Sequence, residues 1–358
     1  MTNFAVAATS DTGPQATTNT SRFRTIAGIR LERNAVLLGA ILVAIVFAAM
    51  IGALSLGDYP MTAWETIANL FGFSDDYLGQ FFVQSQRLPR VMATIAVGAA
   101  LGVSGCIFQQ LSGNTLGSPD IIGFTTGSAT GAVVTIIVLD GSPIATAVGA
   151  LLGGAGAALA VYALTLSNGK LSAARLVLVG IGMASILSAV NALLMVKASI
   201  NAAQTAAQWL AGSFNATTWG EVGFALSTIL VLVPVALLLA RPLSVMITGD
   251  DLAIGLGVDV ERRRRELMIV GVALTAISVA VAGPIAFVAL AAPQLARRIS
   301  RASGIGMGNA ALMGAALVAV SDIIAQRIFA PTQLPVGVVT GLLGGVYLVW
   351  LLGRQWRK

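Results

Sequence analysis

Long apolar runs without charge, separated by short polar segments, make up most of this chain. About twenty such residues form a helix long enough to cross a bilayer, so the pattern predicts an all-α polytopic membrane protein. In the stretch 87–133, two of these runs flank a short glycine-rich turn. The pattern predicts ten spans, at about residues 35–56, 89–111, 120–139, 143–166, 173–196, 221–240, 265–283, 284–300, 309–329 and 334–353.

Two segments bear on this count. Residues 203–212 are apolar but too few to cross, so we expect them at the outer surface. The apolar run is continuous at Gly283 and Pro284, where one long tilted helix would send the C-terminus outside. Ten spans place all but four of the 21 basic residues on the side of both termini, which the positive-inside rule identifies as cytoplasmic. The four outside are Arg87, Arg90, Lys197 and Arg327.

One helical domain, residues 35–353, is expected between two cytoplasmic tails. Residues 1–34 form the first tail, and the part up to about residue 20 lacks periodicity and is expected to be disordered. Residues 354–358 form a basic second tail. Residues 57–86 carry acids and no basic residue, which indicates an outside loop with a short surface helix around Trp64.

Composition supports this class of protein. Of 358 residues, 56% are hydrophobic and 10% charged, against roughly 25% charged in soluble domains. The net charge of +6 would suggest nucleic acid in a soluble protein, but here the basic residues lie in loops, so we expect membrane lipid and no nucleic acid as a partner. Glycines at four-residue spacing predict helices that pack closely within one bundle, although the series from Gly337 could instead lie at a subunit seam or a moving pathway. These glycines are Gly98 and Gly102, Gly149 and Gly153, and Gly337, Gly341 and Gly345.

Several kinds of chemistry are missing from the sequence. It has no histidine, and its single cysteine, Cys106, falls in a predicted span, so no metal, haem or internal disulfide is expected. Ion-coupled carriers need ionisable groups inside the membrane, and only Asp322 lies well within a span. No phosphate-binding G-x-x-x-x-G-K-[ST] motif and no nucleophile–base pair occur, so we expect neither a bound cofactor nor enzymatic activity. A carrier of this kind takes its energy from a partner.

The segment 241–264 is the longest predicted inside loop. Thr248 to Asp251 looks like a helix N-cap followed by acids in the first turn. Apolar residues follow on what should be a water-facing loop, which indicates either a docking element or an ordinary interfacial helix. The basic run Arg262–Arg265 is typical of an anchor for lipid phosphates. The apolar residues are Leu252, Ile254, Leu256 and Val258.

Several motifs in this order resemble the ten-span permease subunits of ABC importers for ferric siderophores and vitamin B12, the type II importers. They are R-L-P-R, N-T-L-G-S-P-D-I-I-G-F-T-T-G, T-G-D-D-L-A-I-G-L-G-V, P-I-A-F-V-A-L-A-A-P-Q-L-A-R, S-D-I-I-A-Q-R and Q-L-P-V-G-V-V-T-G-L-L-G-G-V. The resemblance covers nearly the whole chain from the first span onward. The variant L-G-S-P-D-I-I-G-F looks closest to the ferric-enterobactin branch.

The resemblance implies a dimer of permease subunits, identical or homologous, in the bacterial cytoplasmic membrane. Two ATPase subunits would hold ATP-Mg, and an external binding protein would deliver the cargo. Arg87, Arg90 and Arg327 match outward-facing arginines that pair with carboxylates of the binding protein; helix-end anchoring is the alternative. Asp322 could instead be the intrachain partner of Arg327.

Two further sets of residues follow from the resemblance, and the fifth and tenth spans are expected to line the pathway. Thr115 stands where the family usually has proline, which would fix the backbone and remove a donor, so the rigidity of the gate is open. The residues expected to couple to the ATPases are Gly249, Asp250, Asp251, Leu252, Ala253, Ile254, Gly255, Leu256, Gly257 and Val258. Those expected at the cytoplasmic gate are Asn114, Thr115, Leu116, Ser172 and Ala173.

The sequence therefore predicts a permease for ATP-driven import of a ferric siderophore. Within the same class, the cargo could be cobalamin or haem. From another class, the chain could be an ion-coupled secondary carrier working alone. The scarcity of charged residues within the spans and the resemblance of 249–258 to an ATPase-docking segment argue against that carrier.

Overall fold

The computed structural model describes residues 23–355 except 27, 28, 58, 168, 169, 172, 216, 302 and 303. The fold is all-α, as predicted, with two short antiparallel ribbons. The helices that correspond to the predicted spans are α1 (Arg33–Ser55), α4 (Leu88–Leu111), α5 (Phe124–Ile137), α6 (Pro143–Thr165), α7 (Ala173–Lys197), α9 (Trp219–Met246), α11 (Val260–Ala282), α12 (Val288–Ser300), α13 (Met307–Arg327) and α14 (Val336–Gln355). The remaining elements are α2 (Ala63–Phe71), α3 (Tyr77–Phe81), the π-helical turn η2 (Phe82–Arg87), α8 (Ile200–Leu210), α10 (Asp250–Gly255), β1 (Phe23–Ile26), β2 (Ile29–Glu32), β3 (Leu166–Ser167) and β4 (Lys170–Leu171).

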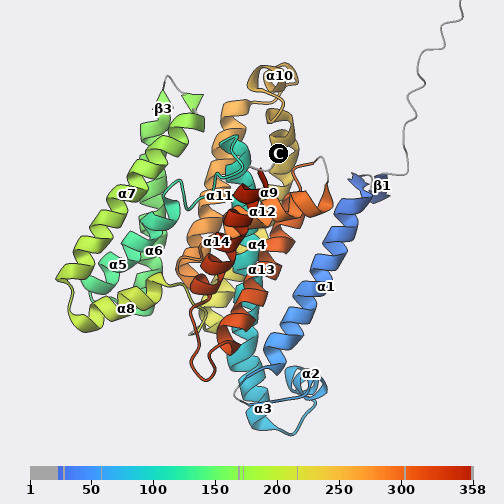
Figure 1. Ribbon diagram of the computed structural model, residues 1–358, viewed down its shortest axis with the longest axis vertical. Helices are drawn as coiled ribbons and strands as arrows, with labels where there is room; N and C mark the ends of the chain where they lie inside the picture. The colour runs from blue at the N-terminus through green and yellow to red at the C-terminus, as the bar shows by residue number, and fades with distance from the viewer. Residues whose placement is uncertain are drawn as a thin grey trace, which may run out of the picture.

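Helix α4 forms the centre of the molecule (Figure 1). Nearly all of its side chains are buried, and it packs against α9, α11, α12 and α13. Small residues make this possible, because a Cβ added at Gly98 or Gly102 would overlap backbone carbonyls of α13. The hydroxyl of Ser104 donates to the Gly271 carbonyl at 2.8 Å, so one polar group inside the bundle is satisfied by α11. The four-residue glycine spacing here serves packing within the chain.

Two groups of helices flank this centre. Helix α1 leans on α12 and α13 along one side, while α5, α6, α7 and α8 form a lobe on the other (Figure 1). In that lobe, Gly131 of α5 and Gly149 and Gly153 of α6 bring the two backbones together. The connection between the lobe and the centre is made largely by α11, which contacts both α5 and α6.

The boundaries differ from prediction in three places. The span expected at 120–139 begins only at Phe124, because residues 112–123 form an irregular linker. The span expected to end at 240 continues to Met246 with Pro242 inside the helix, so the segment 241–264 is mostly helical and not a loop. A proline inside a helix costs one hydrogen bond but does not always end it. The expected break at Gly283 and Pro284 is confirmed, since α11 ends at Ala282 and α12 starts at Val288.

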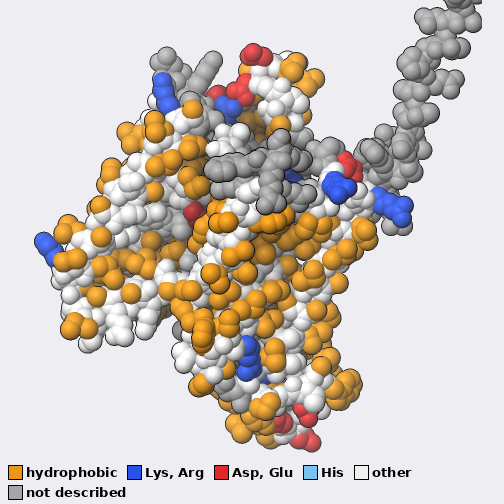
Figure 2. Space-filling model, in the orientation of Figure 1, with side chains coloured by type: hydrophobic (Ala, Val, Ile, Leu, Met, Phe, Trp, Pro, Cys, Tyr) orange, Lys and Arg blue, Asp and Glu red, His pale blue; other side chains and the backbone are white. Residues whose placement is uncertain are grey.

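Seven helices in the described part of the chain are long and apolar enough to cross a membrane. They are α1, α4 with the turns before it, α6, α7, α9, α11 and α13, while α5 and α14 are apolar but shorter. Side chains of the middle zone are largely hydrophobic, and charged ones gather toward the two ends (Figure 2). The start of α1 and the end of α14 lie at the same end of the bundle as α10 (Figure 1).

Candidate functional site

The first predicted docking residue, Arg87, is used inside the chain. It closes η2, and its guanidinium reaches back to the end of α1. Nη1 donates to the Leu54 carbonyl at 2.7 Å, and Nη2 donates to the Tyr59 carbonyl at 2.6 Å. The side chain therefore ties α1 and the following loop to the N-terminal end of α4.

The second docking residue, Arg90, forms a two-point ion pair with Asp322 of α13. Its Nε and Nη2 donate to the two carboxylate oxygens at 3.0 and 2.8 Å, and both side chains are almost wholly buried. Nη1 donates to Gln333 Oε1 at 2.9 Å, so the same arginine also holds the α13–α14 loop. The expectation that Asp322 pairs with Arg327 is therefore wrong. Charge pairs of this geometry are the strong ones, because planar guanidinium and carboxylate groups match.

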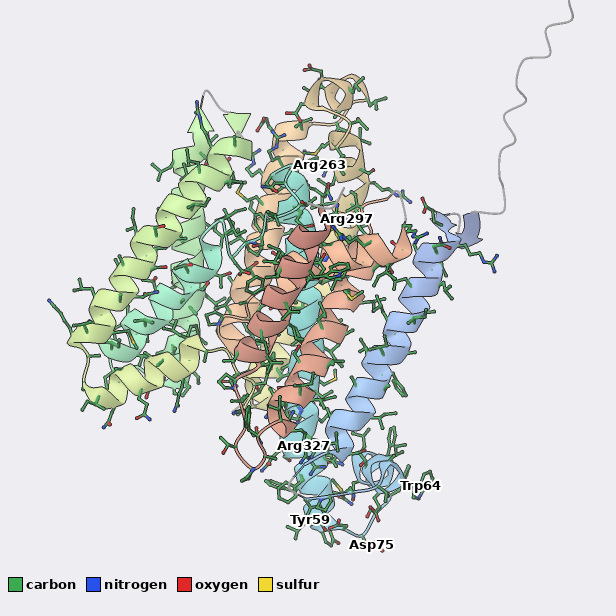
Figure 3. The ribbon with its side chains drawn as sticks, in the orientation of Figure 1. Tyr59, Trp64, Asp75, Arg263, Arg297 and Arg327 are labelled. Atoms are coloured by element: carbon green, nitrogen blue, oxygen red, sulfur yellow. The ribbon has the colours of Figure 1, made fainter. Side chains whose placement is uncertain are left out.

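The third docking residue, Arg327, ends α13 and lies half-buried at the same end of the molecule (Figure 3). Its Nε is buried without a hydrogen-bond partner. The structure therefore brings the three arginines to one end of the bundle, but it binds two of them internally. Their role toward a binding protein stays a prediction.

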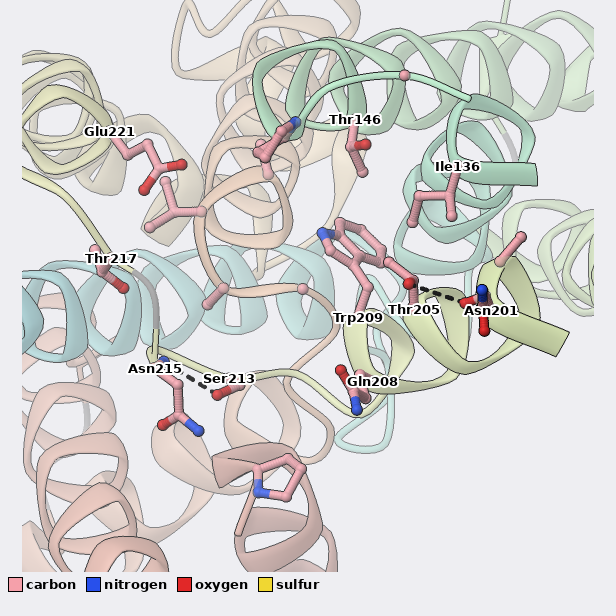
Figure 4. A pocket seen from close by; sticks show the side chains of 18 of the residues that line it. Ile136, Thr146, Asn201, Thr205, Gln208, Trp209, Ser213, Asn215, Thr217 and Glu221 are labelled. Carbon is pink, nitrogen blue, oxygen red and sulfur yellow. Dashed lines mark hydrogen bonds between the residues drawn. The ribbon is translucent and has the colours of Figure 1, made fainter. Parts of the chain in front are cut away.

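A cavity of about 960 Å³, lined by both polar and apolar groups, is shown in Figure 4. Asn201, Thr205 and Gln208 of α8 line it at helical spacing, and Trp209 projects beside them. Gln333, the partner of Arg90, belongs to the same wall. The lining includes the carboxylates Asp140 and Glu221 but no lysine or arginine. Among the polar side chains of the lining, uncharged amides and hydroxyls outnumber the two carboxylates.

The ends of three helices meet at the base of this cavity, and each of them carries a glycine. Gly212 follows α8, Gly283 follows α11, and Gly337 belongs to the first turn of α14. The Gly337 N–H donates to the Gly212 carbonyl at 3.1 Å, and the Ser213 N–H donates to the Ala282 carbonyl at 2.7 Å. A Cβ at any of the three glycines would overlap a neighbouring carbonyl oxygen, and Gly212 and Gly283 also have positive φ. These contacts, which we call the glycine junction, fix the start of α14.

The predicted gate residues Asn114, Thr115 and Leu116 lie exposed in the α4–α5 linker. Asn114 Oδ1 accepts from the Leu116 N–H at 2.9 Å, which gives the linker a local turn. The Thr115 carbonyl accepts a hydrogen bond from Gln294 Nε2 of α12. The turn and this tether are made without the proline that the family usually has.

A second polar link joins α4 to α12 beside the gate. Gln109 Nε2 donates to the Leu290 carbonyl at 2.9 Å, and its Oε1 accepts from Arg297 Nη2 at 2.6 Å. Both Gln109 and Gln294 are buried. Sequence analysis overlooked these glutamines, although an amide within an apolar run is itself a signal. Of the other gate residues, Ser172 lies outside the described residues, and Ala173 begins α7.

The predicted coupling residues form α10 and the turns around it. Asp250 Oδ1 accepts from Arg264 Nη2 at 3.0 Å, so α10 is fixed to the first turns of α11. Leu252, Ile254 and Leu256 project outward from this turn, and Leu256 is 72% exposed. Because α10 lies at one end of the molecule (Figure 1), these three exposed side chains form an apolar knob there.

Two expectations for this region need correction. Thr248 does not cap α10, because its hydroxyl donates backward to the Val245 carbonyl at 2.7 Å and Gly249 takes the N-cap position. Ala253 is buried and Val258 half-buried in a small core between α9 and α11, so neither belongs to the exposed face. Helical geometry explains this, since a short helix against two others must turn one face inward.

Comparison with known proteins assigns the chain to a protein family. A model of the FecCD transport family matches residues 36–354. The chain belongs to the FecCD transport family. It is 42% identical to the ferric enterobactin transport system permease protein FepG of Escherichia coli (strain K12), over 92% of this chain and 99% of the relative. It is 33% identical to the probable siderophore transport system permease protein YfhA of Bacillus subtilis (strain 168), over 90% of this chain and 95% of the relative.

Solved structures agree with this assignment. This FecCD-family chain matches a metal-chelate type ABC transporter in an inward-facing conformation with a TM-score of 0.79 and 25% identity, covering 89% of this chain and 99% of the other. Permeases named for cobalamin and hemin also match, each at 34% identity. The chain is thus a multi-pass membrane protein with the permease fold of ABC transporters.

Proposed function

We propose that this chain is the membrane-spanning subunit of an ATP-driven importer and that its cargo is a ferric siderophore. The observation that carries the proposal is the end-to-end likeness to the ferric enterobactin permease, at 42% identity over 92% of the chain. Ten spans, with both termini and α10 on the cytoplasmic side, complete the topology. The excess of basic residues on that side supports this orientation.

Energy would come from partner subunits. The sequence holds no phosphate-binding loop, so we assign ATP-Mg to two separate ATPase subunits and no cofactor to this chain. The exposed knob Leu252, Ile254 and Leu256 is a suitable docking surface, because apolar groups at a water-facing end favour burial against a protein. The Asp250–Arg264 pair would pass the motion of α10 into α11.

Cargo would enter from an external binding protein at the opposite end and move between this chain and a second permease, with α7 and α14 along the pathway. The gate at the inner end would open when the α4–α5 linker moves relative to α12. The Gln294–Thr115 and Gln109–Arg297 hydrogen bonds are the contacts that such a motion must break or carry along.

The outer cavity would hold cargo weakly. Its lining carries Asp140 and Glu221 and no cation, and carboxylates repel an anionic iron complex. Affinity for such a complex would therefore reside in the binding protein. The permease would offer neutral amides and hydroxyls along which a bulky complex can pass.

Uptake of radiolabelled iron tests the cargo. Cells lacking the gene and complemented cells would receive a panel of ferric siderophores, ferric enterobactin among them. We expect one iron complex to be lost in the deletion strain and restored by complementation. Unchanged uptake of every iron complex, in a strain shown to lack redundant importers, would contradict the proposal.

The runner-up cargoes are cobalamin and haem, because permeases named for both match this chain. Labelled cobalamin and haem therefore belong in the same uptake experiment. Loss of either, with iron-siderophore uptake intact, would keep the importer and change its cargo. Transport in vesicles that depends on an ion gradient and not on ATP would instead identify a secondary carrier.

A further inference from the structure

Helix α2 buries polar side chains and exposes apolar ones, which is the reverse of what is usual for a helix in water. The side that faces the protein is polar, since Thr66 and Asn69 are each only 1% exposed. The Thr66 hydroxyl donates to Ser55 Oγ of α1 at 3.1 Å. The opposite side carries Trp64, Ile67 and Phe71, whose spacing of three and four residues places them on one face. Trp64 is 77% exposed.

The exposed apolar face continues past α2. Phe73 and Tyr77 are 84% and 83% exposed. We call the whole set the outer aromatic surface, consisting of Trp64, Ile67, Phe71, Phe73, Tyr77, Leu78 and Phe81. An exposed apolar area of this kind on a stable protein marks a contact with a partner or a membrane.

Charge narrows the choice of partner. No lysine or arginine occurs from residue 57 to residue 86, so the surface does not select anionic groups. Two of its acids are used locally, because Glu65 Oε2 accepts from the Thr62 N–H at 2.8 Å and Asp76 Oδ1 accepts from the Gly79 N–H at 3.0 Å. The remaining signal is aromatic and apolar. Tryptophan and tyrosine gather at membrane–water interfaces, and tryptophan, phenylalanine and leucine form the apolar face of helices that lie in the interface.

The surface also continues the lipid-facing side of α1. That helix is 23 residues long, few of its side chains are buried, and it ends only eight residues before α2 begins. Helix α2 lies across the lower end of α1 and is seen nearly end-on in Figure 1. Trp64 points outward on the α1 side, away from Arg327 (Figure 3). A helix that crosses the end of a span, with its apolar side out, is placed to lie in the plane of the interface.

We infer that the outer aromatic surface inserts into the headgroup region of the outer leaflet, where lipid carbonyls and the first methylenes are its partners. This contact holds the outer end of α4 at a fixed depth relative to the membrane surface. Helix α3, η2 and α4 are continuous, and Arg87 ties η2 to the Tyr59 carbonyl at 2.6 Å. Only the name of the leaflet rests on the proposed topology.

Spin labels can test the insertion, because Cys106 is the single cysteine and is buried. In the background Cys106→Ala, the variants Ile67→Cys and Phe71→Cys place a nitroxide on the surface, and Asp75→Cys is the matched exposed control. The assembled transporter would be studied in phosphatidylcholine nanodiscs, with collisions of the label measured against oxygen and a water-soluble nickel chelate. We expect a severalfold higher oxygen-to-nickel ratio at 67 and 71 than at 75.

Each other outcome overturns the inference. A nickel accessibility at 67 and 71 equal to that at 75 would place the surface in water. Protection from both agents before the binding protein is added would indicate contact with another subunit. Protection that develops only after its addition would make the binding protein the occupant. Melting of each labelled variant, compared with the Cys106→Ala background, excludes misfolding, and none of these results bears on the cargo.

Discussion

At the scale of single residues, the pair formed by Arg90 and Asp322 holds together the end of the bundle at which α4 begins and α13 ends. The two residues lie on α4 and α13, so the pair joins helices that are 232 positions apart in the sequence. Asp322 also accepts from Gln326 Nε2 at 2.7 Å. A carboxylate so fully bound is removed from water, and its loss of one partner leaves an uncompensated charge.

We expect Arg90→Gln and Asp322→Asn each to destabilise the protein strongly, by about 3–5 kcal/mol if they behave like other broken buried pairs. The double variant should lose less than the sum of the two, because no lone charge remains. Melting of the three purified variants in detergent, measured beside the parent, checks this. Simple additivity of the losses would show that the two side chains do not depend on each other.

The partner of Asp322 is an example of a contact that could not be predicted from the sequence. Residues 322 and 327 are five apart on one helix, which turns them about 140° away from each other. Arg90 comes from another helix, and only the packing of α4 on α13 brings it to Asp322. Likewise, Gln109 and Gln294 are visible as amides in apolar runs, but their carbonyl partners depend on the tertiary fold.

At the scale of elements, the existence and order of the long helices follow from apolar run length alone. The irregular segments and the exact helix ends do not follow from run length. The linker 112–123 and the continuation of α9 through Pro242 depend on packing that overrides local preference. The sequence also indicated a surface helix near Trp64 but not the direction in which its apolar side points.

Glycine packing between α4 and α13 gives an element-scale prediction. A Cβ at Gly102 would overlap the Ala310 carbonyl oxygen, whereas one at Gly156 of α6 meets no atom within 4 Å. Gly102→Ala should therefore destabilise by about 1–3 kcal/mol through overpacking. Gly156→Ala should be neutral or slightly stabilising, because alanine is the better helix former. Thermal unfolding of both variants in detergent decides, and equal melting temperatures would contradict the close approach of α4 to α13.

The knob on α10 gives the second prediction at this scale. Leu252→Asp places a charge on a face proposed to be buried against an ATPase, so ATPase stimulation by the loaded binding protein should be lost. Leu252 is 62% exposed, so the variant should still fold and reach the membrane. Arg265→Gln, an exposed change on neighbouring α11, is the control and should retain stimulation. Normal coupled transport by the Leu252→Asp variant would contradict the role of α10 in docking an ATPase subunit.

At the scale of the whole molecule, the two ends differ in kind. One end presents the α10 knob and the glutamine-tethered linker, and the other presents the arginines, the cavity lined by α8 and the outer aromatic surface. Composition and charge predict that these ends lie on opposite sides of a membrane. The cavity itself was not foreseen, because its lining comes from the ends of several helices, which are distant in the sequence.

The glycines of α14, Gly337, Gly341 and Gly345, give a prediction about how two subunits assemble. Gly337 packs inside the chain, but a Cβ added at Gly341 or Gly345 would meet no atom within 4 Å, and the adjacent Leu342 is 69% exposed. A second permease would cover this side of α14, since small residues let helices approach closely in lipid. A photo-crosslinking residue at Leu342 should therefore yield a product of about twice the 36.5 kDa of the chain.

The matched control for this crosslink is Phe47, an exposed residue on the lipid-facing side of α1. The same photo-crosslinker there should leave the chain monomeric on a denaturing gel, because its neighbours are lipids. Mass spectrometry of the Leu342 product would show whether the partner is an identical chain or a homologous permease. A permease crosslink from position 47 and none from 342 would place the seam on α1 and leave the open glycines of α14 facing lipid.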